Sequence, residues 1–110
     1  IDGMAIRVPV PTGSITEFVV TLDETVTATA VNDAFRAAAD DGPLAGVLGY
    51  TDDEVVSSDI VGLPFSSYVD LESTNVIADG GLVKILTWYD NEYGFSCRML
   101  DMAAYVTAES

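Results

Sequence analysis

The stretch Leu82-Val83-Lys84-Ile85-Leu86-Thr87-Trp88-Tyr89 decides the fold. β-Branched and aromatic residues dominate it, so it predicts a strand over residues 82–89 that is too apolar to face water on either side. Asp79-Gly80-Gly81 stands immediately before this strand and is typical of a hairpin turn. We therefore expect a covered strand that the chain enters through a hairpin.

Shorter apolar runs, separated by Gly, Pro and acidic residues, predict further strands upstream. The expected ranges are 4–8, 14–22, 47–51, 67–71 and 75–78. The run 14–22 carries Ile15, Phe18 and Val19, which predicts a strand buried on at least one side.

Two segments have the period of a helix. In residues 29–39 the apolar side chains recur at helical spacing and share one face, and Gly42-Pro43 ends the helix. That face is formed by Val31, Ala34, Phe35 and Ala38. A last helix is expected from about Asp90-Asn91 to about Ala108, with one stripe formed by Phe95, Met99, Met102 and Val106.

Only one short helix lies among the strands, so most strand pairs must be antiparallel. The predicted fold class is α+β, a mostly antiparallel sheet with a helix packed on one face and a C-terminal helix. Residues 1–110 suit a single domain. The chain begins Ile1-Asp2-Gly3, without an initiator Met, which favours a segment of a longer chain.

The charge of the chain is strongly negative. It has 18 Asp and Glu against 4 Lys and Arg, and 49% of its residues are hydrophobic, a fraction too high for a disordered acidic chain. Nucleic acid and anionic membranes need clustered basic residues, so neither is an expected partner. Two explanations of the charge stay open: adaptation to a salt-filled cytoplasm, and an ordinary acidic cytosolic protein.

The residues offer little chemistry of their own. There is no histidine and the one cysteine is Cys97, so no Cys-His pair exists, and neither metal-ligand spacing nor a Gly-x-Gly-x-x-Gly motif occurs. We expect no catalytic residue and no metal site in this chain. The acidic clusters at residues 23–24, 40–41 and 52–54 are interpreted as solvated surface.

Two polar residues are candidates for a structural or a functional role. Arg7 lies in an apolar run, where it suits either an internal ion pair or a bound phosphate. Asn91 lies at the expected start of the last helix, where Asn commonly caps the free N–H groups.

Four stretches of the sequence together resemble phosphorylating glyceraldehyde-3-phosphate dehydrogenases of a halophilic, haloarchaeal-like type. In chain order they are residues 3–9 (GMAIRVP), 42–50 (GPLAGVLGY), 55–59 (VVSSD) and 88–96 (WYDNEYGFS). The resemblance covers the whole chain but only the C-terminal part of a family subunit. It implies a partial catalytic domain, with the Rossmann domain and the catalytic Cys and His lying upstream.

The resemblance also implies a function and site residues. The family oxidises glyceraldehyde 3-phosphate with inorganic phosphate and NAD or NADP, as a cytoplasmic homotetramer. By resemblance Arg7 helps bind phosphate and Asn91 contacts the nicotinamide carboxamide. Phe95 replaces a family tyrosine beside the nicotinamide, so the ring is kept and the hydroxyl is lost. Two alternatives remain: an erythrose-4-phosphate dehydrogenase segment, and a folding or assembly module without activity.

Overall fold

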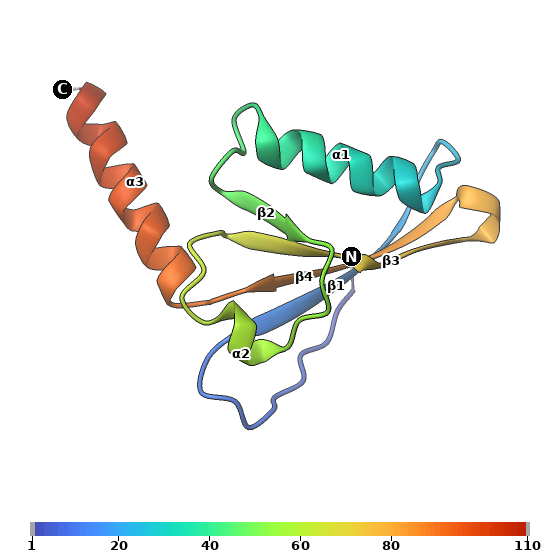
Figure 1. Cartoon of the computed structure of the whole chain (residues 1–110), viewed down its shortest axis with the longest axis horizontal. Helices are drawn as coiled ribbons and strands as arrows, with labels where there is room; N and C mark the ends of the chain where they lie inside the picture. Colours follow the sequence, from blue (N-terminus) through green and yellow to red (C-terminus); the bar gives the residue numbers. More distant parts are fainter. Residues whose placement is uncertain (1, 110) are drawn as a thin grey trace.

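The computed structural model describes residues 2–109. Within them, a four-stranded sheet has the order β1-β4-β3-β2 (Figure 1). The strands are β1 (Ser14–Thr21), β2 (Leu48–Thr51), β3 (Ser67–Ile77) and β4 (Leu82–Tyr89). The helices are α1 (Ala28–Asp40), α2 (Ser57–Ile60), the short 3-10 turn η1 (Ala78–Gly80) and α3 (Tyr93–Glu109). The α+β class is confirmed.

The predicted strand 82–89 is β4, and it lies inside the sheet. It pairs antiparallel with β1 on one side and with β3 on the other, and none of its residues is exposed. β2 and β3 are parallel, because the chain returns between them through α2 and its flanking loops. Two of the three strand pairs are therefore antiparallel, as the sequence predicted.

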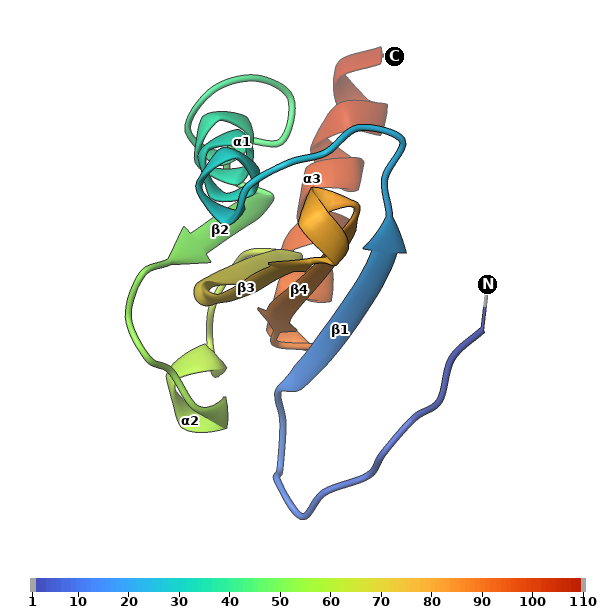
Figure 2. The same ribbon diagram turned by 90° about the vertical axis from the view of Figure 1, so that its right-hand side faces the viewer.

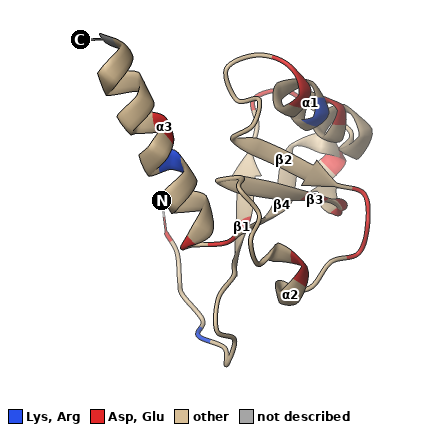
Figure 3. Cartoon of the chain, turned by 60° about the vertical axis from the view of Figure 1, so that its left-hand side comes forward, with Lys and Arg blue, Asp and Glu red and all other residues tan. Residues whose placement is uncertain are grey.

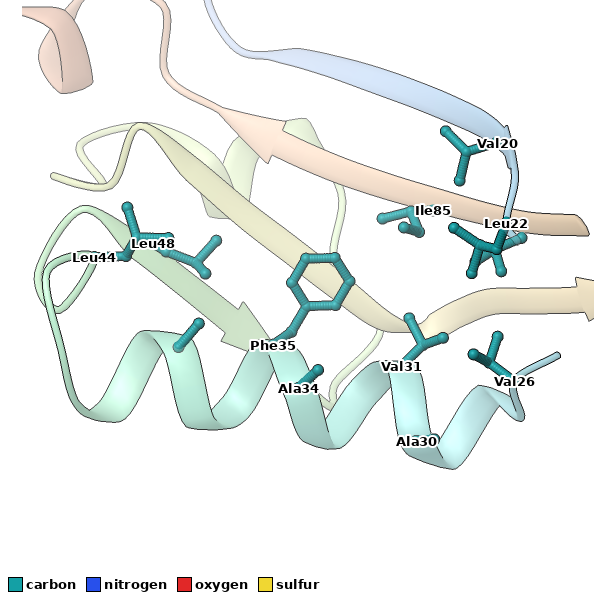
Figure 4. A pocket seen from close by; sticks show the side chains of 12 residues that line it. Val20, Leu22, Val26, Ala30, Val31, Ala34, Phe35, Leu44, Leu48 and Ile85 are labelled. Carbon is teal, nitrogen blue, oxygen red and sulfur yellow. The ribbon is translucent and has the colours of Figure 1, made fainter. Parts of the chain in front are cut away.

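Helix α1 covers part of one sheet face. Thr27 caps it, with its side-chain oxygen accepting the Ala30 N–H at 3.1 Å. Phe35 and Ala38 pack against a core of Leu48, Val69 and Leu71, which lies over β2 and β3. Farther along, α1 and the β1–β4 side of the sheet face each other across an open apolar cleft (Figure 4). The predicted apolar face of this helix is confirmed.

The prediction that β1 is buried on one side is wrong. Phe18 is 51% and Val19 is 52% exposed. β1 is an edge strand of the described sheet, and α1 packs over β2 and β3 without reaching it. The apolar composition of β1 could not indicate that α1 does not extend over it.

The strand expected at residues 4–8 is also absent. Residues 2–13 contain only bends, and in Figure 2 they run clear of the neighbouring strand β1. A strand needs a paired neighbour for its N–H and C=O groups, and within the described chain this segment has none.

Three smaller differences concern element boundaries. The two strands expected at 67–71 and 75–78 form one strand, β3, with a register shift between Asp70 and Asn75. The hairpin turn is formed by η1, where Ala78 and Asp79 have positive φ. Helix α2 was not expected, and α3 begins at Tyr93 rather than at residues 90–91.

Helix α3 projects from the sheet (Figure 1). The four residues of its predicted stripe are between 59% and 65% exposed. The radius of gyration is 15.5 Å, whereas a compact domain of this length has about 13 Å. The accessible surface is 7671 Å², against about 5,800 Å² for a compact monomer of this mass. The described fold therefore leaves apolar faces uncovered.

Acidic residues occur in α1, α2, α3 and the loops (Figure 3). The predicted solvated clusters at 23–24, 40–41 and 52–54 are all exposed. Arg36 bridges two exposed acids, Asp33 in α1 at 3.0 Å and Asp52 of the third cluster at 2.6 Å. Among residues 2–109, no helix is both long enough and apolar enough to cross a bilayer.

Candidate functional site

The junction between β4 and α3 is built around the Asp90 carboxylate. Asp90 is only 4% exposed and accepts four hydrogen bonds. Oδ1 accepts the backbone N–H groups of Glu92 and Tyr93, both at 2.9 Å, and the Thr12 hydroxyl at 3.3 Å. Oδ2 accepts the Gly62 N–H at 2.9 Å. One side chain therefore joins the start of α3 to the loop after α2 and to the N-terminal segment.

These contacts stabilise the charged form of Asp90. The N–H groups of Gly62 and Tyr93 lower the pKa of the carboxyl below its usual value, although burial acts in the opposite direction. The carboxylate is thus ionised at neutral pH, and it also lies at the positive end of a helix.

Gly94 brings α3 close to the loop before β3. A Cβ on this residue would lie 2.7 Å from the Phe65 carbonyl oxygen, so the first turn of α3 fits only because Gly94 has no side chain. The position of the junction is therefore fixed from two directions, by the Asp90 hydrogen bonds and by this backbone contact.

Asn91 does not cap α3. The side chain that receives the first N–H groups of the helix is that of Asp90, so the capping interpretation of Asn91 is wrong by one residue. Asn91 instead accepts the Gly13 N–H through Oδ1, at 3.2 Å. Its Nδ2 makes no hydrogen bond within the described residues, and the residue is exposed. The side chain is held by its oxygen and presents an unused donor.

Arg7 is exposed and makes no ion pair with any of the described acids. The internal ion pair considered for it is therefore not present in residues 2–109. Arg7 lines a hollow between the N-terminal segment and the face of β1 and β4 that turns away from α1, and Asn91 lines the same hollow. Figure 2 shows the gap between the N-terminal segment and β1 from its side.

The other candidates lie apart from this hollow. Phe95 is 65% exposed in the first turn of α3 and is not among the residues that line the hollow. Cys97 is a free, half-buried thiol. Among the described residues, no group of three or more His, Cys, Asp or Glu is arranged to hold a metal ion.

Sequence reasoning missed Asp90. Asp is as good an N-cap as Asn, so the pair Asp90-Asn91 contained the signal for a cap but not which residue provides it. The contacts to Thr12 and Gly62 join residues far apart in the sequence, and no local pattern predicts them.

Comparisons with a family model and with individual proteins point to the same family. The family model for the C-terminal domain of glyceraldehyde 3-phosphate dehydrogenase matches residues 1–91. The chain is 68% identical, over 107 residues, to a glyceraldehyde-3-phosphate dehydrogenase of Haloarcula vallismortis, covering 97% of this chain and 31% of that protein. Against the Streptomyces coelicolor enzyme the identity is 54% over 106 residues, covering 96% of this chain and 31% of that protein.

A third relative, glyceraldehyde-3-phosphate dehydrogenase 1 of Bacillus cereus, is 48% identical over 109 residues, covering 99% of this chain and 32% of that protein. The chain thus spans about a third of the length of the curated relatives it matches. The matched region includes Arg7, Asp90 and Asn91. The chain belongs to the family of glyceraldehyde-3-phosphate dehydrogenase C-terminal domains.

Proposed function

We propose that this chain is part of the catalytic domain of a phosphorylating glyceraldehyde-3-phosphate dehydrogenase. The proposed reaction converts glyceraldehyde 3-phosphate, inorganic phosphate and NAD or NADP to 1,3-bisphosphoglycerate. The relatives support this assignment, because the matched proteins of Haloarcula vallismortis, Streptomyces coelicolor and Bacillus cereus are all glyceraldehyde-3-phosphate dehydrogenases.

In this proposal Arg7 binds phosphate. A guanidinium holds phosphate oxygens with two parallel hydrogen bonds, provided that no carboxylate occupies it first. Arg7 meets this condition, because no described acid lies within ion-pair distance of it.

Asn91 contacts the nicotinamide carboxamide in the same proposal. A carboxamide oxygen requires a donor, and the unused Nδ2 of Asn91 is one, while the Gly13 contact holds the opposite end of the side chain. Phe95 provides an exposed ring near the start of α3 that can pack beside the nicotinamide. When bound, NAD or NADP accepts the hydride; this chain contributes binding and orientation.

The observation that carries the proposal is the shared hollow. Arg7 and Asn91 are 84 positions apart in the sequence, yet both line it, and each keeps hydrogen-bond donors without a partner in the described chain. A site that binds a phosphate and an amide together needs such donors on one surface.

The remaining parts of the enzyme are proposed to lie outside this chain. With no histidine and with its only cysteine in α3, the chain lacks a Cys-His pair for attack on an aldehyde. We therefore assign residues 1–110 to a partial catalytic domain, and the nucleotide-binding domain and the catalytic pair to the rest of a cytoplasmic homotetramer. The isolated chain is inactive in this proposal.

Steady-state kinetics of the full-length protein test both residue roles. Arg7→Ala should raise the phosphate KM by about tenfold to a hundredfold, the scale of a lost charge-assisted hydrogen bond. Asn91→Ala should raise the cofactor KM by about tenfold, because the carboxamide loses its donor. The matched control is Arg36→Ala, which removes an α1 arginine that is already paired with Asp33 and with Asp52.

The control should leave both KM values unchanged. An unchanged phosphate KM in Arg7→Ala would remove Arg7 from the site, and an unchanged cofactor KM in Asn91→Ala would remove Asn91. If both constants stayed at their wild-type values, the hollow would have no part in the reaction.

A further inference from the structure

Asp90 does more than a helix cap requires. Two of its four hydrogen bonds, to the N–H groups of Glu92 and Tyr93, satisfy the start of α3 in the usual way. The other two, from Thr12 and Gly62, come from segments that a cap does not involve. The side chain is therefore a junction of three segments.

Asp90 and Asn91 together hold two consecutive residues of the N-terminal segment. Thr12 donates its hydroxyl to Asp90 Oδ1 at 3.3 Å, and Gly13 donates its N–H to Asn91 Oδ1 at 3.2 Å. The contact that holds the Asn91 side chain thus depends on the position of Gly13, and the neighbouring Thr12 is held by Asp90. Loss of the Asp90 contacts would release the segment that orients Asn91.

We propose that Asp90 is a positioning residue for cofactor binding: by joining Thr12, Gly62 and the start of α3, it sets the orientation in which Asn91 presents its Nδ2. This inference rests on the proposed function, in which Asn91 contacts the nicotinamide. Asp90 itself touches no substrate, because it is buried beneath the junction while Asn91 is exposed.

The first variant is Asp90→Asn in the full-length protein. The remaining carbonyl oxygen can still accept the N–H groups of Glu92 and Tyr93, which keeps the helix cap. The new NH₂ group meets the Gly62 N–H, donor against donor, so the link to the α2 loop breaks. The neutral amide oxygen is also a weaker acceptor than a carboxylate for the Thr12 hydroxyl, so the hold on the N-terminal segment loosens. The cofactor KM should rise about tenfold, with the aldehyde KM changed by less than about twofold.

Thr27→Ala is the matched structural control. Thr27 caps α1 through one side-chain oxygen, just as Asp90 caps α3, but it lies at the far end of the sheet from Asn91 and does not line the hollow. It should lower the melting temperature and leave the cofactor KM unchanged. If Asp90 had only a structural role, Asp90→Asn would likewise lower the melting temperature and leave the cofactor KM unchanged.

A double-mutant cycle shows whether Asp90 acts through Asn91. In the Asn91→Ala background the donor is already gone, so adding Asp90→Asn should raise the cofactor KM by less than about twofold. A further tenfold rise would mean that Asp90 affects binding by another route, and the inference would be wrong.

The outcomes separate this inference from the proposed function. If Asn91→Ala leaves the cofactor KM unchanged, both fail. If Asn91→Ala raises it but Asp90→Asn resembles Thr27→Ala, the positioning role fails and the proposed function stands. If Asp90→Asn does not fold, Thr12→Val replaces it: the cofactor KM should rise about threefold, and Thr12→Ser should restore the wild-type value. Equal cofactor KM values in these two Thr12 variants would overturn the inference.

Discussion

The two ends of the candidate site are built in opposite ways. At the β4–α3 junction the Asp90 carboxylate is buried and meets donors from three segments. In the N-terminal segment Arg7 is exposed and has no acidic partner among residues 2–109. The difference follows from the tasks we propose for them. A neutral amide must be oriented by a rigid backbone, whereas a phosphate-binding guanidinium must be left available.

The largest expected effect is the complete absence of dehydrogenase activity when the chain that carries both regions is separated from the rest of the enzyme. The 110-residue chain, mixed with glyceraldehyde 3-phosphate, phosphate and NAD or NADP, should show no cofactor reduction by absorbance. The chain contains no Cys-His pair, and orientation by Asn91 cannot replace one. Turnover proportional to chain concentration, and retained after a contamination control, would contradict the proposal.

Stability should separate the two regions next. In the full-length protein, Asp90→Ala should lower the free energy of unfolding by about 2–4 kcal/mol, because it removes a helix cap and leaves the Gly62 N–H without its acceptor. Arg7→Ala should leave the urea midpoint of unfolding unchanged, since the described chain gives Arg7 no partner to lose. A large loss in Arg7→Ala would show that Arg7 is a structural residue.

Low pH should reduce stability by protonating Asp90 at the junction, and Arg7 should not contribute to this loss. The Gly62 and Tyr93 N–H groups hold the folded-state pKa of Asp90 below its usual value, so its stabilising contribution is fully present above the pKa of the unfolded chain. The contribution is lost as the pH falls through the lowered folded-state pKa. Asp90→Asn should therefore lose less stability than wild type between about pH 5 and pH 2. Melting temperatures across this range provide the measurement, and parallel curves would contradict it.

The smallest expected effect is that of salt. Exposed acids repel one another across about 30 Å at 0.01 M salt but only about 3 Å at 1 M. Raising KCl from 0.01 M to 1 M should therefore raise the melting temperature by about 4 °C or more. The buried hydrogen bonds of Asp90 are screened much less. The difference in melting temperature between wild type and Asp90→Ala should therefore persist at both concentrations. A wild-type melting temperature that stays level or falls would count against salt adaptation.

The parts of the fold that the sequence predicted are those fixed by local pattern. Strand β4 and the apolar face of α1 follow from alternation and helical spacing alone. The wrong predictions concern partners. Residues 4–8 have the composition of a strand but lack a paired neighbour in the described chain, and β1 lacks a covering layer. β3 continues through residues 71–74, because its pairing with β4 resumes at Asn75 after a shift in register.

The candidate site divides in the same manner. Arg7, Asn91 and Phe95 came from a resemblance to a family, and the structure brings the first two to one hollow. Asp90 was missed because its importance lies in its contacts with Thr12 and Gly62, which no spacing in the sequence indicates. A single sequence can thus name the exposed donors of this site more readily than the buried acceptor beneath them.

The pairing of β1 with β4 has a consequence for synthesis on the ribosome. Thr21 pairs with Leu82 and Ser14 with Tyr89, so α1, β2, α2 and β3 are all made between the two partners. Throughout that interval the apolar strand β1, with Ile15, Phe18 and Val19, lacks the only strand with which it pairs in residues 2–109. Unpaired strands of this kind associate with one another, and like charges on emerging chains oppose such association. The excess of acidic residues in this chain should therefore oppose association through β1 until β4 has been made.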